Sequence, residues 1–413
     1  MNVRNLAGVA AGALGTALIV TAALAQTVPP TKGPAVDGSP AWFLQGSFPD
    51  PGGRTSVDAN GVVTVIPRPE GAPFAAGARP ASIQGCRHST ACQNRNGPQR
   101  GQLQRVQWEQ KLGYNFSYPI QLPPGIGGVP AVALDSKNNL WVFQRKPAGN
   151  AQLLRYSPAG KLTLSVGDDV IGHADKAHGM AVDAEDNVYV IDTANATVKK
   201  VSPDGKLLQT IGTSGHPGDW DEGKSQRLLW EPVMIAFGPN GDMYIAQGHG
   251  NESPNVVDSD DPTNNIGAAR VLHLDKAGNY VGQWFGHNTG RGKFQNAHGL
   301  GVDPKTGDVW VGDREDYRII IFNSKGEYLR QIATENLVCA IQFDHNGEPW
   351  MASGQDGQFL KLDRKTGKVV GATGNGMGIG KGQFIEASYW VFDKQNNMWA
   401  GDTSVGRVTR IAK

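Results

Sequence analysis

One phrase recurs six times between residue 130 and the C-terminus, and it constrains the fold more than any other feature of the chain. Each copy is an apolar strand ending near an Asp, a Gly/Asn turn and a second apolar strand, as in HGMAVDAEDNVYVID. The copies align on Asp135, Asp183, Gly238, Asp303, Asp344 and Asp393, at spacings of 41 to 65 residues. A repeat of this length with two to four short strands is typical of a β-propeller blade, which buries its apolar faces only against neighbouring blades. We therefore expect an all-β fold with six blades.

The ends of the repeat region predict how the ring closes. The last copy is followed by RVTRIAK, which supplies a third strand. The sixth blade then needs an outer strand from residues before the first blade, and we expect it within residues 100–122. The propeller is expected over residues 116–413. An acidic insertion at 248–270 interrupts the third blade, and loops of that length in a compact domain are usually functional or disordered.

The N-terminus reads as a secretory leader. Arg4 precedes a stretch of small and apolar residues, and Ala23-Leu24-Ala25 forms an A-x-A cleavage site. We expect residues 1–25 to be a signal peptide. The alternative, a membrane anchor, fits less well because the stretch is rich in Ala and Gly. The mature protein is then expected in a bacterial periplasm or outside the cell, with no membrane attachment.

The next segment, residues 26–115, is a Pro/Gly-rich extension with one Cys pair. In an exported chain Cys86 and Cys92 are expected to form a small disulfide loop, which leaves Cys339 as a protected thiol. His88 lies between the two cysteines, but a metal site there would lack a fourth ligand.

Charge and composition exclude one class of partner. The chain has 413 residues, a formal net charge of +1 and a pI of about 7.7. It contains no basic run, so a nucleic-acid partner is not expected. The sequence does not indicate an oligomeric state.

The repeat identifies one equivalent position near the axis in every blade. The residue five before each aligned position begins the innermost strand. Its six occupants are Pro130, His178, Val233, His298, Cys339 and Ser388. Neutral imidazoles that converge on an axis suit a borderline divalent metal such as zinc. The alternative is that both histidines only cap their strands by hydrogen bonding.

Two arginines follow the second strand of their blades at the same rim. Arg145 lies in WVFQRKP and Arg314 in VGDREDYR. Guanidinium groups from two blades suit an anionic ligand, because Arg binds a carboxylate through two parallel hydrogen bonds. The alternative is a surface arginine that pairs with a neighbouring acid such as Asp313 or Asp316.

These phrases together resemble a known family. VALDSKNNLWVFQR, AHGMAVD and GKFQNAHGLGVD…VGDREDYRI resemble the peptidyl-α-hydroxyglycine α-amidating lyases, which are six-bladed NHL-type propellers. The resemblance covers roughly residues 125–411. It implies that Arg145 and Arg314 are active-site arginines. It also implies that His178 and His298 are metal ligands.

The chain departs from the family pattern at three places. Ser388 stands where the family has its third metal histidine, and Tyr389 replaces a carboxylate that helps to hold a structural calcium, so that calcium is not expected. His249 stands where the family has its catalytic Tyr. Glu386, His249 or Cys339 could supply the third metal ligand. We assign this role to Glu386, two residues from Ser388 on an extended strand, and the role of catalytic base to His249.

The expected function is that of an exported, metal-dependent, lyase-like enzyme acting on a small or peptide-terminal substrate with a carboxylate. Zinc is the expected metal and would act as a Lewis acid. Arg145 and Arg314 would hold the carboxylate. One alternative is a non-catalytic propeller that binds a ligand or a protein. Another is a gluconolactonase-type hydrolase, although such enzymes usually hold calcium through Glu, Asn and Asp, and the ring positions lack that set.

Overall fold

The computed structural model describes most of the chain from residue 108 onward. Residues 108–413 are described except 110–111, 124–125, 146–150, 175, 250–268, 288–291, 295, 315–316, 355, 377 and 404, together with the backbone of β1 (Gln26–Thr27), β2 (Thr55–Val57), β3 (Val63–Val65) and β4 (Val106–Gln107). The predicted signal peptide, Cys86, His88 and Cys92 lie outside these residues. The leader and the disulfide therefore stay predictions.

Within the described residues, six four-stranded antiparallel sheets form the blades. Blade 1 is β6 (Ala131–Leu134), β7 (Leu140–Phe143), β8 (Leu153–Tyr156) and β9 (Leu162–Val166), and blade 2 is β10 (Ala177–Val182), β11 (Val188–Asp192), β12 (Thr197–Val201) and β13 (Leu207–Ile211). Blade 3 is β16 (Pro232–Phe237), β17 (Met243–Gln247), β18 (Arg270–Leu274) and β19 (Tyr280–Trp284), and blade 4 is β20 (Ala297–Val302), β21 (Val309–Asp313), β22 (Arg318–Phe322) and β23 (Tyr328–Ala333). Blade 5 is β24 (Ala340–Phe343), β25 (Pro349–Ala352), β26 (Phe359–Leu362) and β27 (Val369–Thr373), and blade 6 is β28 (Ala387–Phe392), β29 (Met398–Asp402), β30 (Val405–Ala412) and β5 (Asn115–Ser117). The expected six-bladed propeller is confirmed.

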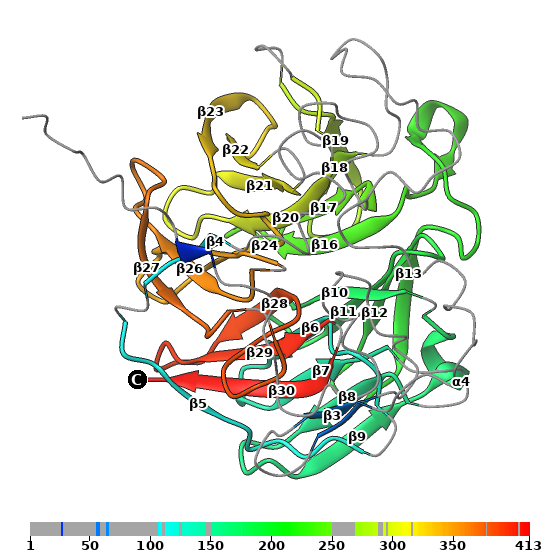
Figure 1. The fold of residues 1–413 in the computed structure, drawn as a ribbon. Helices are drawn as coiled ribbons and strands as arrows, with labels where there is room; N and C mark the ends of the chain where they lie inside the picture. The colour runs from blue at the N-terminus through cyan, green and yellow to red at the C-terminus, as the bar shows by residue number, and fades with distance from the viewer. Residues whose placement is uncertain are drawn as a thin grey trace, which may run out of the picture.

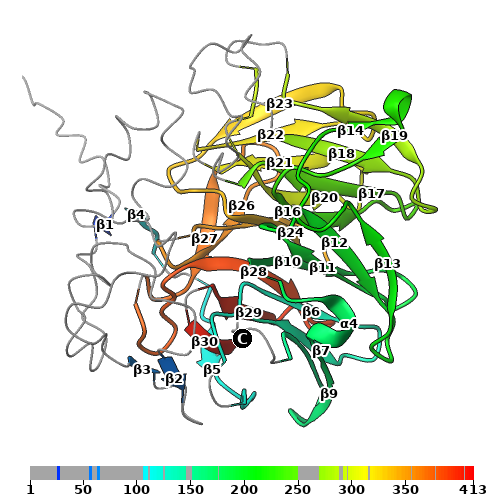
Figure 2. The same cartoon turned by 90° about the vertical axis from the view of Figure 1, so that its right-hand side faces the viewer.

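The innermost strands form a closed ring. Each of β6, β10, β16, β20, β24 and β28 contacts the innermost strands of both neighbouring blades. They gather at the centre of the molecule in both views (Figures 1 and 2). Large aromatic side chains fill the space between blades, and Trp141, Trp310, Trp350 and Trp390 are fully buried there. Because each sheet buries its faces only against its neighbours, the fold depends on complete closure.

Closure comes from the N-terminal side of the propeller, as the sequence predicts. Strand β5 pairs with β30, with Phe116 opposite Ile411. Figure 1 shows the cyan β5 beside the red β30 next to the C-terminus. The segment before β5 packs on blade 5: the Trp108 indole donates a hydrogen bond to Asn336 Oδ1 at 2.7 Å, and the Tyr114 ring meets Trp350 edge-on. The propeller therefore uses residues on both sides of the expected boundary at residue 116.

The repeated Asp shapes the turn that joins the first two strands of a blade. Asp135 Oδ1 accepts the backbone N–H groups of Lys137 and Asn139 at 3.0 and 2.8 Å. Asp344 makes the same pair of bonds to Asn346 and Glu348. This Asx-type turn satisfies the exposed backbone and sets the hairpin register. The repeated Asp in the sequence therefore marks a recurring turn between the first two strands of a blade.

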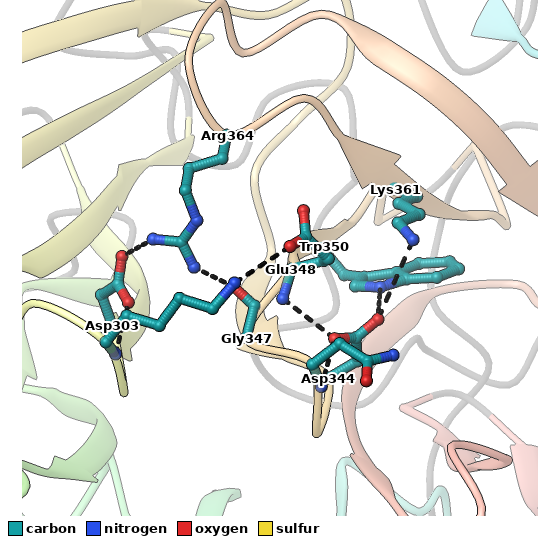
Figure 3. A network of polar contacts seen from close by, with 9 residues as sticks. Asp303, Asp344, Gly347, Glu348, Trp350, Lys361 and Arg364 are labelled. Atoms are coloured by element: carbon teal, nitrogen blue, oxygen red, sulfur yellow. Dashed lines mark hydrogen bonds and ion pairs between the residues drawn. The ribbon is translucent and has the colours of Figure 1, made fainter.

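The same turns link neighbouring blades through their side chains (Figure 3). Arg364 of blade 5 donates hydrogen bonds to Asp303 of blade 4 and to the Gly347 carbonyl of its own blade. Lys305 of blade 4 lies 3.1 Å from the Glu348 carboxylate of blade 5. Polar contacts therefore reinforce the apolar packing between these two blades.

Two short elements lie between the blades: α4 (Asp168–Ile171) after blade 1, and the hairpin of β14 (Trp220–Asp221) and β15 (Gln226–Arg227) around η1 (Glu222–Lys224) after blade 2. Over the described part of the chain, no helix has both the length and the apolar character needed to cross a bilayer.

Removal of the closing strand tests how much the ring depends on it. A variant that begins at residue 119 lacks β5 and leaves an unpaired edge on β30. We expect it to be insoluble, or to melt roughly 10 °C or more below a matched variant that begins at residue 105. Thermal unfolding followed by circular dichroism measures the difference. Equal melting temperatures would show that β5 does not close the ring.

Candidate metal centre

His178 and His298 lie at matching register shifts near the start of their innermost strands. In β10 the register shifts between Ala177 and Met180, and in β20 it shifts between Ala297 and Gly299. Each shift inserts one extra residue, and such a β-bulge redirects the side chain that it carries. The same shift occurs in β16 and β28, where the ring positions are Val233 and Ser388, so the bulge belongs to the repeat and is not confined to the histidines.

Acidic side chains at the ends of the second strands fix the segments that enter these bulges. Asp192 Oδ1 accepts the backbone N–H of Lys176 at 3.3 Å, and Asp313 Oδ1 accepts that of Asn296 at 2.8 Å. Asp313 is fully buried and also forms an ion pair with Arg318 at 2.7 Å. The Asp that ends the repeated phrase in blades 2 and 4 therefore holds the backbone just before each histidine.

A glycine lets the next blade approach His178 closely. A Cβ atom on Gly179 would lie 2.3 Å from the Val233 carbonyl oxygen of blade 3, which no side chain could accept. This proximity lets His178 Nδ1 lie 3.1 Å from the same oxygen. The His-Gly pair in the sequence is therefore a packing requirement as well as a candidate ligand.

Three imidazoles converge at this end of the axis. Among the described residues, His178, His249 and His298 form the group whose potential ligand atoms all lie within 4.8 Å of one another. Their ring centres are 4.8 to 5.3 Å apart, and the side chains are only 1 to 5% exposed. His249 follows β17, next to the insertion of blade 3. The structure thus brings one histidine from each of blades 2, 3 and 4 to one point.

Hydrogen bonds assign the tautomers of two of these rings. His178 Nδ1 lies 3.1 Å from the Val233 carbonyl, and His298 Nδ1 lies 2.7 Å from the Cys339 carbonyl. A carbonyl oxygen only accepts, so each Nδ1 carries the proton and each Nε2 keeps its lone pair. His298 Nε2 is buried and has no hydrogen-bond partner among the described residues. A metal-ligating histidine usually donates its other N–H to a carbonyl or carboxylate in this way.

The environment keeps all three imidazoles neutral. Burial, followed by nearby positive charges, holds the pKa values of His178, His249 and His298 well below the usual 6.5. Arg145, Lys176 and Arg314 are among those charges. Neutral imidazole is the form that coordinates a metal ion.

The two predicted arginines lie at the same site. Arg145 Nε donates a hydrogen bond to the Ala177 carbonyl at 2.9 Å, beside His178. The charge of Arg314 lowers the pKa of His298 more than any other nearby charge does. Arg314 is buried, whereas Arg145 is partly exposed. Both guanidinium groups thus lie close to the imidazole group.

Glu386 lies near the imidazoles but outside their group. It is buried, and burial raises the pKa of its carboxyl against the opposing effect of Arg314 and Arg145. It precedes β28, and the register of that strand shifts between Ala387 and Trp390. The argument from strand alternation that linked Glu386 to Ser388 therefore does not apply.

The remaining ring positions also lie outside the imidazole group. Ser388 and Cys339 are buried, and neither is among the three residues whose ligand atoms converge. Cys339 contributes through its backbone, because its carbonyl accepts the His298 N–H. Its side chain packs beside Gly354, where an added Cβ would lie 2.5 Å from the Cys339 sulfur.

The sequence analysis assigned no role beside the imidazoles to Tyr389 or Lys176. The Tyr389 hydroxyl donates to the His298 backbone carbonyl at 3.1 Å, and its ring stacks on His298 at an angle of 5°. Lys176 Nζ lies 3.1 Å from His249 Nδ1. Tyr389 follows the ring position Ser388 directly, and that adjacency was the available signal. Nothing in the sequence indicated a site role for Lys176, except that it lies two residues before His178.

A cavity of about 310 Å³ occupies a different part of the axis. The middle and later residues of the innermost strands line it, including Val132, Met180, Met234, Leu300 and Trp390. None of the three histidines lines this cavity. The imidazole group therefore lies at the start of the innermost strands, apart from this cavity.

Comparisons with known proteins agree with this architecture. The NHL repeat family model matches residues 294–322, which include His298 and Arg314. The peptidyl-glycine alpha-amidating monooxygenase of Mus musculus is 27% identical over 305 residues, which cover 64% of this chain and 29% of that protein. The peptidyl-alpha-hydroxyglycine alpha-amidating lyase 1 of Drosophila melanogaster is 27% identical over 259 residues, covering 54% of this chain and 43% of that protein.

The chain thus spans less than half the length of either relative. A solved structure described as a putative gluconolactonase has a TM-score of 0.51 at 13% identity and covers 73% of this chain and 93% of its own, so it shares the fold alone. The repeat match, the six-bladed ring and the named relatives converge on one conclusion. This chain is a six-bladed β-propeller of the NHL-repeat type, similar in sequence to proteins named as peptidyl-α-hydroxyglycine α-amidating lyases.

Proposed function

We propose that this protein is an exported, metal-dependent, lyase-like enzyme whose substrate carries a carboxylate. The single observation that carries the proposal is the convergence of three buried imidazoles within 4.8 Å, two of them with Nδ1 on a backbone carbonyl. Neutral histidines are rarely collected in this way for packing alone, because each buried ring nitrogen then needs a partner. The relationship to the amidating lyases supports the reaction class.

The donor set fits a catalytic zinc site. His178 and His298 would hold the ion through Nε2, and His249 would join them once its Nδ1 no longer accepts a hydrogen bond from Lys176 Nζ. Three protein ligands with an open fourth position are typical of catalytic zinc. The buried His298 Nε2 has no hydrogen-bond partner among the described residues, and its lone pair would bind the ion. Bound zinc supplies Lewis-acid polarisation of a substrate hydroxyl or carbonyl oxygen.

The arginines orient the substrate. Arg145 is anchored by its bond to the Ala177 carbonyl, and Arg314 lies on the His298 side of the site. A carboxylate between two guanidinium groups receives charge-assisted hydrogen bonds from both, which fix the neighbouring carbon relative to the imidazoles. This arrangement suits the α-hydroxyglycine end of a peptide or a small acid of similar shape.

We assign proton transfer to Glu386, which is buried and lies under the influence of Arg314 and Arg145. Because His249 lies within the ligand group, the role of base that the sequence analysis assigned to it passes to another residue. Burial raises the pKa of Glu386, which makes its carboxylate a stronger base than an exposed one. In cleavage of an α-hydroxyglycine, a base removes the hydroxyl proton, a C=O bond forms, and the C–N bond breaks. The amide nitrogen then receives the proton as glyoxylate leaves.

Metal content tests the proposal directly. Purified protein that is incubated with zinc and then desalted should retain about one ion per chain. The change His298→Ala should abolish retention, because it removes both a ligand and the link to blade 5. The change His216→Ala alters an exposed histidine outside the group and should leave the metal content unchanged. If wild-type protein retains no zinc, manganese, iron or cobalt, the non-catalytic binding propeller becomes the better account.

The reaction is tested by glyoxylate release from a peptide that ends in α-hydroxyglycine. We expect zinc-loaded protein to release glyoxylate. The change Arg314→Met should leave the zinc in place but raise KM by roughly tenfold or more, since a charge-assisted contact to the carboxylate is lost. Metal-loaded protein that releases no glyoxylate would exclude this peptide as substrate, and a KM unchanged in Arg314→Met would exclude the carboxylate contact.

A further inference from the structure

Each blade carries an aromatic side chain near the start of its second strand, next to a cationic side chain or a histidine. The aromatic residues, in blade order, are Trp141, Tyr189, Tyr244, Trp310, Trp350 and Trp399. Their partners, in the same order, are Arg155, Lys200, His273, Arg330, Lys361 and Arg410. The five cations lie 5.2 to 5.9 Å from the ring centres, and the histidine stacks on its tyrosine. The pair is thus part of the repeat, and its six copies can be compared directly.

The pair in blade 6 differs from the other five in the burial of its ring. The other aromatic side chains are at most 3% exposed, whereas Trp399 is partly exposed. In blades 2, 4 and 5 a Phe at the end of the next innermost strand meets the ring edge-on. Leu134, which is smaller and not aromatic, occupies this position next to Trp399. One aromatic ring of the repeat therefore remains accessible.

The cation of blade 6 differs from the others as well. In the other five pairs an oxygen atom binds the cation or the histidine: backbone carbonyls bind Arg155 and Arg330, and carboxylates bind Lys200, His273 and Lys361. Arg410 is partly buried, yet no residue that the structure describes accepts a hydrogen bond from its guanidinium group or forms an ion pair with it. A guanidinium group has five N–H donors, and burying them without acceptors is unfavourable. These donors are therefore available to a ligand.

Trp399 and Arg410 line one pocket of about 390 Å³ where blade 6 meets blade 1. Leu134 of blade 1 also lines it, and Figure 1 shows β29 and β30 beside β6 and β7. The turn residues Asn138 and Asp393 border the same pocket. The pocket therefore lies at the end of the innermost strands, whereas the imidazole group lies at their start, and the two sites are separate.

The carboxylate that lines this pocket is already bound within its own turn. Asp393 Oδ1 accepts the backbone N–H groups of Gln395 and Asn397, both at 2.9 Å. The side-chain amide of Asn397 donates to Asp393 Oδ2 at 3.0 Å. These hydrogen bonds offset the negative charge of Asp393. Among the residues that line the pocket, Arg410 is thus the charged side chain without a polar partner.

We propose that this pocket binds a small aromatic carboxylate, with the carboxylate on Arg410 and the ring against Trp399. A guanidinium group binds a carboxylate through two parallel hydrogen bonds, and an aromatic ring packs favourably against a second ring. A single negative charge matches the pocket better than a dianion, because one arginine is the unpaired positive group and Asp393 lies nearby. The inference does not depend on the proposed lyase activity.

Benzoate, acetate and benzyl alcohol test the two contacts separately, because acetate lacks the ring and benzyl alcohol lacks the charge. Isothermal titration calorimetry on the wild-type protein should show benzoate binding about tenfold or more tightly than either of the other two compounds. A protein that does not bind benzoate would overturn the proposal. Equal binding of benzoate and acetate, or of benzoate and benzyl alcohol, would overturn it too.

Variants assign benzoate binding to this pocket. The changes Arg410→Met and Trp399→Leu should each weaken benzoate binding by about tenfold or more, since each removes one of the two contacts. The change Arg314→Met alters the candidate metal centre and should leave the affinity for benzoate unchanged. Benzoate that binds normally to the Arg410→Met and Trp399→Leu variants, but weakly to Arg314→Met, would be bound at the metal centre, and the proposal would be wrong.

The matched control is Arg155→Met, which alters the same pair in blade 1. There Trp141 is fully buried and the Pro203 carbonyl binds the arginine, so this pair has no contact to offer a ligand. The affinity of this variant for benzoate should equal that of the wild-type protein. An equal loss of affinity in Arg155→Met and Arg410→Met would show that the loss is not specific to the pocket, and would contradict the proposal.

Failure here is distinguishable from failure of the proposed function. Thermal unfolding and zinc content, measured on the same preparations, report whether the Arg410→Met and Trp399→Leu variants still fold and hold the metal. Folded variants that bind benzoate as tightly as the wild-type protein reject this pocket and leave the lyase proposal untouched. Protein that holds no metal yet binds benzoate through Arg410 rejects the lyase proposal and keeps the aromatic carboxylate site.

Discussion

A hydrogen bond between neighbouring blades determines the chemistry at the axis. His178 of blade 2 bonds the carbonyl of Val233, and His298 of blade 4 bonds the carbonyl of Cys339. Val233 and Cys339 are themselves the ring-position residues of blades 3 and 5. Each bond fixes a tautomer, turns Nε2 to the site and depends on the next blade lying at the correct distance. The candidate metal centre is therefore a product of ring closure, and β5, far from the histidines, contributes to it by completing blade 6.

The fold could be predicted because one strand–turn–strand phrase is repeated six times, with an Asp at the turn in five of the copies. Asp135 and its equivalents mark the hairpins in the sequence, and the same alignment identifies the ring positions. It also predicted that a strand before blade 1 would complete the ring. The site was harder to predict in full. Alternation along a strand fails at β-bulges, and bulges occur at the ring positions of β10, β16, β20 and β28. Glu386 was therefore assigned as a ligand by a rule that this part of the structure breaks.

Other site residues have no fixed place in the repeat. His249 comes from the segment after β17, beside an insertion that no other blade has, so no alignment predicts where its ring points. Lys176 precedes its strand, and its position depends on the bond from its backbone N–H to Asp192. The family resemblance implies a third histidine on the last blade, where this chain has Ser388. The structure places a third imidazole on blade 3 instead. The number of imidazoles is thus kept, while the blade that supplies the third one differs.

The identity of the ligands is the most direct test of this arrangement. X-ray absorption at the zinc edge of the metal-loaded protein reports the type and number of atoms bound to the ion. Coordination by His178, His249 and His298 predicts three imidazole nitrogens at about 2.0–2.1 Å and one further light atom. A sulfur atom at about 2.3 Å would instead indicate a cysteine ligand, of which Cys339 is the one at a ring position. Fewer than three imidazoles would show that His249 is not a ligand and would contradict the three-histidine site.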